Sequence, residues 1–133
     1  MNPILRNILA FVLGAIIGGI VNMAIVTISP SVFPLPEGFD PNDVNTYAEH
    51  IDDFSYGNFF MTFLAHALGT LVGALIAVKV AATHKVKLAY AIGVFTMLGG
   101  IAAVFMIPAP TWFIAVDLLL AYIPMAWLAS KTA

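Results

Sequence analysis

The sequence predicts an all-α integral membrane protein whose four helices each cross the bilayer once. Hydrophobic residues make up 62% of the 133 residues and charged residues only 9%, whereas soluble domains are about half apolar and about one quarter charged. Four apolar runs, at about residues 4–28, 58–81, 87–107 and 111–129, each have the roughly 20 residues that a helix needs to cross a hydrocarbon core. We therefore expect a single membrane domain, residues 1–133, forming a four-transmembrane-helix bundle.

The first apolar run, from Ile4 to Ile28, begins around Arg6 and so has the outline of a secretory signal. Such a signal has an apolar region of only about 7–15 residues and a small-residue cleavage site. This run is longer and no such site closes it. We expect an uncleaved first span.

The one long connection, residues 29–57, separates the first two spans. Its proline-rich beginning, Ser29–Pro36, is expected to be non-helical and to lie along the outer interface. Asp40 followed by Pro41 predicts a helix N-cap and first helical position. Beyond them, apolar residues recur at helical spacing and acidic and amide residues occupy the other face, which predicts a short amphipathic helix on the outer surface. The apolar set is Val44, Tyr47, Ile51 and Phe54.

The other two connections are short, residues 82–87 and Pro108–Pro110. Short links of this kind join antiparallel neighbours, so the second, third and fourth spans should pack side by side. Within the fourth span, Pro124 cannot donate to the carbonyl of Leu120, and its ring clashes there. We expect a kink about one turn beyond Asp117.

The charges predict how the spans are oriented. Cytoplasmic loops of membrane proteins are enriched in Lys and Arg. The predicted topology puts every Lys and Arg on one side and six of the seven acids, all within residues 29–57, on the other. Both termini should then be cytoplasmic and the 29–57 connection outside. The basic residues are Arg6, Lys79, Lys85, Lys87 and Lys131.

In general outline the chain resembles small four-span proteins of bacterial inner membranes, and this resemblance implies a location in the bacterial cytoplasmic membrane. The few dispersed cations form no basic groove, so no nucleic-acid partner is expected. The chain has no cysteine, and only one histidine falls inside a span. We expect no metal, no cofactor and no catalytic residues, and therefore no enzyme.

Small residues recur at four-residue spacing in the first two spans. Because the hydrophobic effect does not hold helices together in lipid, such stripes let backbones approach closely. Both stripes should face other helices, either within one bundle or in a homo-oligomer built on one of them. The first stripe is Ala10, Gly14 and Gly18, followed by Asn22, and the second is Ala65, Gly69, Gly73 and Ala77.

Three strongly polar residues lie deep within the spans, Asn22, His66 and Asp117. Each is seven residues from the outer end of its span, about 10 Å along a helix. A lone carboxylate at that depth is costly, so we expect Asp117 to contact His66, with Asn22 as an additional partner. Thr62 and Thr70 lie one turn on either side of His66 and add hydroxyl groups to the same helix face.

Two functions fit this polar layer. One is a proton-linked or cation-linked transport or binding protein that uses His66, Asp117, Asn22, Thr62 and Thr70. The alternative is a non-catalytic structural or assembly subunit of a larger membrane complex, in which the layer only holds helices together. The expected partners are the lipid bilayer and either further copies of the chain, in a homo-oligomer, or a larger membrane complex.

Overall fold

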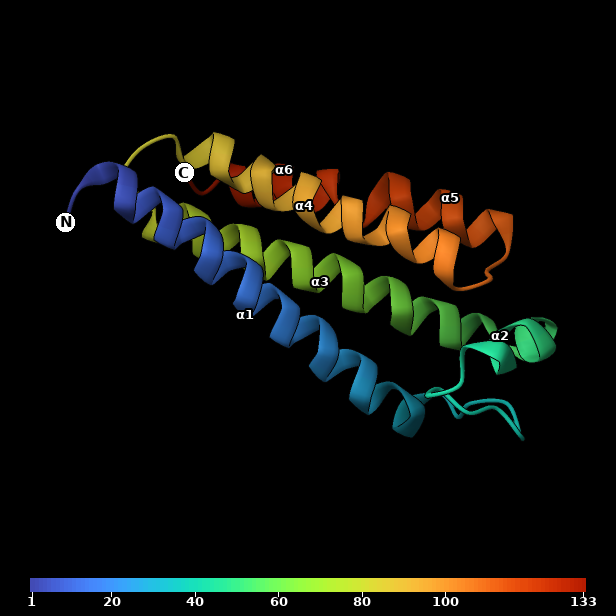
Figure 1. The fold of residues 1–133 in the computed structure, drawn as a ribbon. Coiled ribbons are helices and arrows are strands. Elements are labelled where there is room, and N and C mark those ends of the chain that lie inside the picture. The colour runs from blue at the N-terminus through green and yellow to red at the C-terminus, as the bar shows by residue number, and fades with distance from the viewer.

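The computed structural model describes all 133 residues, which form an all-helical bundle without strands (Figure 1). Four helices are long and apolar enough to span a membrane: α1 (Pro3–Val32), α3 (Tyr56–Val80), α4 (Lys85–Met106) and the broken helix α5 (Thr111–Leu120) with α6 (Ile123–Ser130). Both termini and the α3–α4 turn lie at one end, here called the basic end, and residues 33–55 and 107–110 lie at the other, the acidic end (Figure 1).

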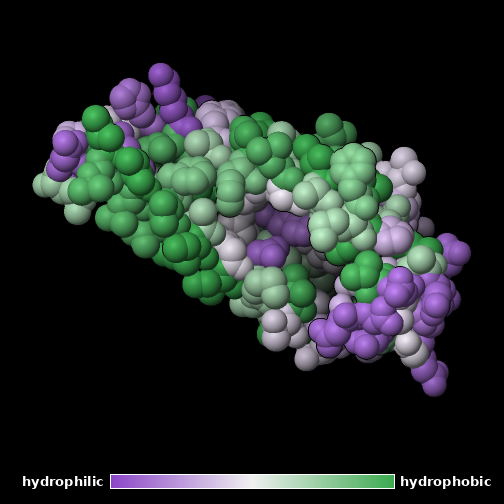
Figure 2. Space-filling model, viewed as in Figure 1, coloured by the Kyte–Doolittle hydropathy of each residue, from purple (hydrophilic) through white to green (hydrophobic).

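Residue hydropathy follows this division. Figure 2 shows hydrophobic residues over the middle of the molecule and hydrophilic residues gathered at its two ends. Many large apolar side chains in the middle are exposed, among them Ile16 and Ile20 of α1 and Leu119 of α5. A surface of this kind is typical of helices that face lipid.

Helix α1 continues through Pro30 to Val32, so the expectation that Ser29–Pro36 is non-helical is wrong for its first four residues. Proline has no amide hydrogen to give to the carbonyl of Val26, four residues earlier. The hydroxyl of Ser29 donates to that carbonyl instead, at 2.9 Å. The helix ends only where Phe33, which precedes Pro34, takes an extended conformation, as the residue before a proline favours.

The helix in the long connection, α2, spans Val44–His50 and is followed by the short 3-10 helix η1, Ile51–Asp53. Its N-cap is Asp43, whose side chain accepts from the amide of Asn45, so the prediction of Asp40 as N-cap is wrong by three residues. Asp40 instead accepts from the amide of Asn42 and closes a turn that precedes the helix. A short polar side chain can close such a turn as readily as it caps a helix.

The fourth span is broken where the kink was expected. Helix α5 ends at Leu120 and α6 begins at Ile123, with Pro124 in the first turn of α6. The missing donor and the ring of Pro124 account for the interruption. Ala121 and Tyr122 form the break between the two halves.

The two stripes of small residues pack against each other within the chain. A Cβ built on Gly14 would lie 2.5 Å from the carbonyl oxygen of Gly73, and one built on Gly18 would lie 2.6 Å from that of Gly69. Only glycine allows backbones to approach this closely. Toward the acidic end, α1 diverges from α3 (Figure 1).

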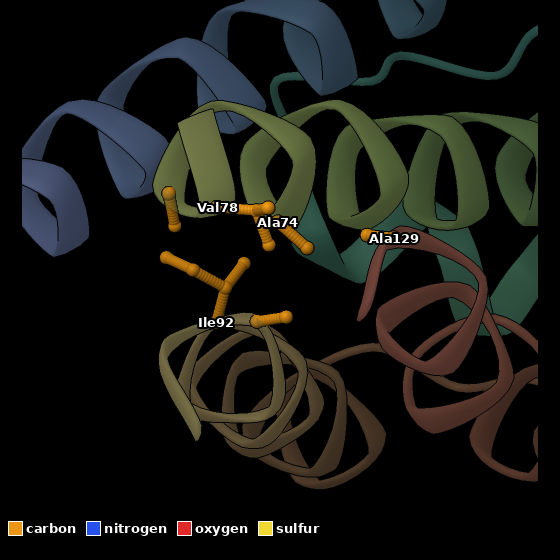
Figure 3. Packing of buried hydrophobic residues seen from close by; sticks show 6 residues of the cluster. Ala74, Val78, Ile92 and Ala129 are labelled. Carbon is orange, nitrogen blue, oxygen red and sulfur yellow. The ribbon is translucent and has the colours of Figure 1, made fainter. Parts of the chain in front are cut away.

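At the basic end, α3, α4 and α6 enclose a small hydrophobic core. Figure 3 shows Ala74 and Val78 of α3, Ile92 of α4 and Ala129 of α6 meeting there, and all four are at most 2% exposed. Most of these side chains are small, so the three helices pack closely. Helix α1 contacts α3 and α4 but neither α5 nor α6.

Candidate functional site

His66, Asp117 and Tyr122 form a hydrogen-bonded triad near the middle of the bundle. The Nδ1 atom of His66 lies 2.8 Å from Oδ1 of Asp117. The hydroxyl of Tyr122 donates to the second carboxylate oxygen, Oδ2, at 2.9 Å and also lies 3.1 Å from Nδ1 of His66. The rings of His66 and Tyr122 stack with their centroids 5.9 Å apart. The sequence-based expectation that His66 and Asp117 touch agrees with this geometry.

The triad is assembled from three different segments of the chain. His66 comes from α3, Asp117 from the last turns of α5, and Tyr122 from the break before α6. In an unbroken helix, residues five positions apart point about 140° apart. The break turns Tyr122 back toward Asp117, so the interruption caused by Pro124 also completes the triad.

Asp117 is buried, with only 5% of its surface exposed. Both of its oxygens accept hydrogen bonds from the triad, which offsets much of the cost of placing a carboxylate in an apolar interior. When Asp117 is ionised, it can only accept, so Nδ1 of His66 must carry the hydrogen. The neutral imidazole then has its second nitrogen, Nε2, as an acceptor.

Nε2 of His66 is the free position of the triad. It makes no hydrogen bond within the chain. A buried nitrogen without a partner would be exceptional here, since the one buried side-chain nitrogen or oxygen that lacks a partner is Oδ1 of Asn22. Nε2 is therefore not fully buried. The His66 side chain keeps 24% of its surface exposed. A base held through Nδ1 by a carboxylate, with Nε2 accessible, can accept and release a proton.

His66 lies at the inner end of a cavity of about 470 Å³ at the acidic end. The cavity is bounded by the end of α1, the first turns of α3, the connection 35–54 and the α4–α5 turn. No residue of α3 beyond His66 lines it, so it does not extend to the basic end. The aromatic lining residues are Phe39, Tyr47, Phe54, Phe59 and Phe113.

The connection 35–54 lines this cavity toward the acidic end. Phe39 packs edge-on against Tyr47 and Phe54, at centroid distances of 4.8 and 4.9 Å. Asn58 ties the start of the connection to α3, since its amide donates to the carbonyl of Phe33 at 3.0 Å. We call this cluster of Phe39, Tyr47 and Phe54 the aromatic cap.

The other predicted members of the polar layer are not part of the triad. Asn22 makes no hydrogen bond to His66 or Asp117, so its expected role as an additional partner is wrong. It faces the α1–α3 contact, where its Cβ lies 3.1 Å from a Cβ built on Gly69. The rotation of α3 explains this, because the stripe of small residues faces α1 while His66 faces α5.

The two threonines satisfy their hydroxyls elsewhere. Thr62 donates to the carbonyl of Asn58 at 3.1 Å and lines the cavity. Thr70 is buried and donates to Thr96 of α4 at 2.9 Å. Thr70 therefore links two helices one turn below His66.

Tyr122 is the member that sequence reasoning missed. A signal was present, because Pro124 predicts the break and a phenol inside a span needs a partner for its hydroxyl. In a regular helix, Tyr122 would point away from Asp117, so the helical spacing did not predict the contact. As for metals, no group of three His, Asp or Glu side chains lies close enough to hold an ion.

Comparison of the chain with protein-family models, with curated proteins and with solved structures finds no match.

Proposed function

We propose that the chain is a bacterial inner-membrane protein that binds a small molecule in the cavity above His66 and exchanges a proton with it through the His66–Asp117–Tyr122 triad. The observation that carries this proposal is the accessible Nε2 of His66 at the inner end of the cavity, while buried Asp117 fixes Nδ1. A purely structural pair has no need of an open nitrogen.

Insertion in the membrane is the first part of the proposal. The four long apolar helices and the exposed side chains along α1, such as Ile8 and Ile20, favour it. The positive-inside rule orients the basic end toward the cytoplasm. The acidic end, with α2 and the aromatic cap, then lies at the outer surface.

Proton exchange is the second part, and the donor set favours a proton over a metal cation. Both oxygens of Asp117 already accept hydrogen bonds, which leaves Nε2 of His66, a residue that lines the cavity, as the one nitrogen of the pair without a partner. One nitrogen is too few ligands for a metal site. A protonated His66 would stay paired with Asp117 at 2.8 Å, so the triad holds an added charge without rearrangement.

Binding is better supported than passage through the bundle. The residues that line the cavity all lie toward the acidic end of the bundle. Toward the basic end, the hydrophobic core of α3, α4 and α6 fills the interior. Transport would need a second conformation that opens this core. The proposal therefore covers one-sided binding linked to a proton.

The alternative is a structural or assembly subunit, in which the triad only holds α3 to the α5–α6 segment. Hydrogen bonds between membrane helices contribute about 0.6 kcal/mol on average. That function requires the three hydrogen bonds but neither the cavity nor the open nitrogen. The experiment below separates the two.

The test is nuclear magnetic resonance of ¹⁵N-histidine in nanodiscs. The chain has three histidines, and His50→Gln with His84→Asn leaves His66 alone. Asparagine is chosen for position 84 because His84 has a positive φ of 52°, which asparagine tolerates. We expect the hydrogen on Nδ1, titration at Nε2, and loss of this tautomer preference in Asp117→Asn.

Chemical access is measured in parallel in sealed vesicles. Diethyl pyrocarbonate should modify His66 Nε2, and Thr70→Val, a change outside the cavity, should leave that rate unaltered. The structural alternative would be established by three results together. The His66 resonance is indifferent to pH, diethyl pyrocarbonate does not modify His66, and the chain copurifies with a larger complex.

A further inference from the structure

The cavity opens through the side of the bundle as well as facing the acidic end. Figure 2 shows a hollow in the middle of a hydrophobic face, with hydrophilic residues at its floor. In the matching view of Figure 1 this place lies over α3, between α1 on one side and the hairpin of α4 and α5 on the other. Helix α1 makes no contact with α5 or α6, so these helices do not meet across the hollow.

Residues from both edges of this gap line the cavity. Val26 and Thr27 of α1 line it on one side, and Ile107 and Ala109 of the α4–α5 turn line it on the other. Val26 is 41% exposed, so it lies at the rim and not in the interior. The rim is largely apolar, which would admit a molecule dissolved in lipid without stripping it of bound water.

Toward the acidic end, the cavity is lined by the aromatic cap. Its rings pack together, and Tyr47 and Phe54 stack with centroids 6.4 Å apart. Six acidic residues belong to the same connection, residues 29–57. A water-soluble anion would meet both the charge and the cap before it reached His66.

The lining specifies a chemical class. Five aromatic side chains surround the space, and aromatic rings favour stacked or edge-on contacts with another ring. The polar side chain at the inner end is that of His66, and its unpaired Nε2 accepts a hydrogen bond when neutral and donates one when protonated. A volume of about 470 Å³ lies within the range of small-molecule sites.

From these observations we infer that the ligand is an uncharged, lipid-soluble ring compound whose oxygen substituent hydrogen-bonds to His66, and that it enters from the bilayer between α1 and the α4–α5 turn. The inference builds on the proposed proton-linked binding and adds the ligand class and the route. The hydroxyl of such a ring donates to neutral Nε2, and a ring carbonyl accepts from protonated Nε2.

The experiment uses the full chain in nanodiscs with 4-octylphenol as the probe. 1-Octanol, which has the tail and hydroxyl but no ring, is the ligand control. We expect 4-octylphenol to shift the ¹⁵Nε2 resonance of His66 saturably and 1-octanol to shift it weakly. Equal shifts with both, or a shift that never saturates, would overturn the ligand class.

The route is tested with bulky substitutions on one helix. Val26→Trp fills the rim and should slow the association of 4-octylphenol by roughly tenfold, because it narrows the route into the cavity. Ile20→Trp, on an exposed position outside the cavity, should have no effect. Thr27→Phe is a second rim variant in case Val26→Trp does not fold.

Entry through the aromatic cap predicts the opposite pattern. Phe39→Ala would then accelerate binding while Val26→Trp and Ile20→Trp behaved alike, and that result would refute lateral entry. If 4-octylphenol fails to bind while His66 still titrates and reacts with diethyl pyrocarbonate, only the ligand class and route are wrong. If His66 is silent in both assays, the proposed function itself is wrong.

Discussion

Gly100 of α4 makes room for the tyrosine of the triad, and this predicts a specific defect in the Gly100→Ala variant. A Cβ built on Gly100 would meet the hydroxyl of Tyr122 and would lie 2.7 Å from its Cζ atom. That is 0.7 Å short of the 3.4 Å at which an ordinary contact begins. The ring must therefore move, and the neighbouring Gly99, with nothing within 4 Å of its Cβ position, supplies a matched control.

The size of the effect follows from the two hydrogen bonds of the hydroxyl. They measure 2.9 Å to Asp117 and 3.1 Å to His66, and a displacement of 0.7 Å along either would stretch it beyond 3.5 Å. At about 0.6–1.7 kcal/mol each, their loss costs about 1–3 kcal/mol. Replacing a helical glycine by alanine returns about 0.5–1 kcal/mol. We expect Gly100→Ala to lower the free energy of unfolding by about 0.5–2 kcal/mol and Gly99→Ala to raise it by up to about 1 kcal/mol.

The assay is unfolding in mixed detergent micelles, followed by circular dichroism, together with the His66 nitrogen resonances. A double-mutant cycle with Tyr122→Phe isolates the hydroxyl, because a phenylalanine ring can move without breaking a hydrogen bond. Gly100→Ala should be milder in the Tyr122→Phe background. Equal stability of the Gly99 and Gly100 variants, or an undiminished effect in that background, would refute the reasoning.

Three further predictions concern packing and topology. Gly18→Ala should lower the unfolding free energy by about 1–3 kcal/mol, since its Cβ would lie 2.6 Å from a backbone carbonyl, while Gly19→Ala, in open space, should be neutral or stabilising; equal stabilities in the micelle assay would contradict this. Asn7→Ala should cost about 1 kcal/mol, because the Asn7 side chain accepts from two amides of the α3–α4 turn at 3.0 and 3.1 Å; an unchanged unfolding midpoint would show that water replaces it. Cysteines introduced singly at positions Asn45 and Lys85 should react with an impermeant reagent in intact cells only at position 45, and the reverse pattern would overturn the proposed orientation.

The features that sequence predicted well are those set by local rules. The four long apolar helices follow from run length and composition, and the break at Ala121–Tyr122 follows from Pro124, which lacks a donor. The contact between His66 and Asp117 could be predicted because both residues need a partner at the same depth. None of these requires knowledge of how the helices are rotated.

The features that sequence missed depend on tertiary geometry or on competing side-chain bonds. The hydroxyl of Ser29 donates to the carbonyl of Val26, which Pro30 leaves unpaired, so α1 extends past the proline. The contacts of Asn22 and Tyr122 depend on helix rotation and on how far the break turns the chain. An equal depth within the bundle restricts which residues can meet, but it does not determine which of them face each other.

The position of the cavity nevertheless has a cause that can be traced to the sequence. The stripe of α1 that faces α3 is small at Ala10, Gly14 and Gly18, and continuing at the same four-residue spacing it becomes Asn22, Val26 and Pro30. Where the stripe is small, the backbones touch; where it becomes large, α1 diverges (Figure 1). The aromatic cap and the acidic connection fill part of the resulting space, and the remainder is the cavity that ends at His66. Tight packing at the basic end and an open site at the acidic end are therefore two consequences of one pattern. The stripe changes from small to large residues at Asn22, whose buried side-chain oxygen has no partner.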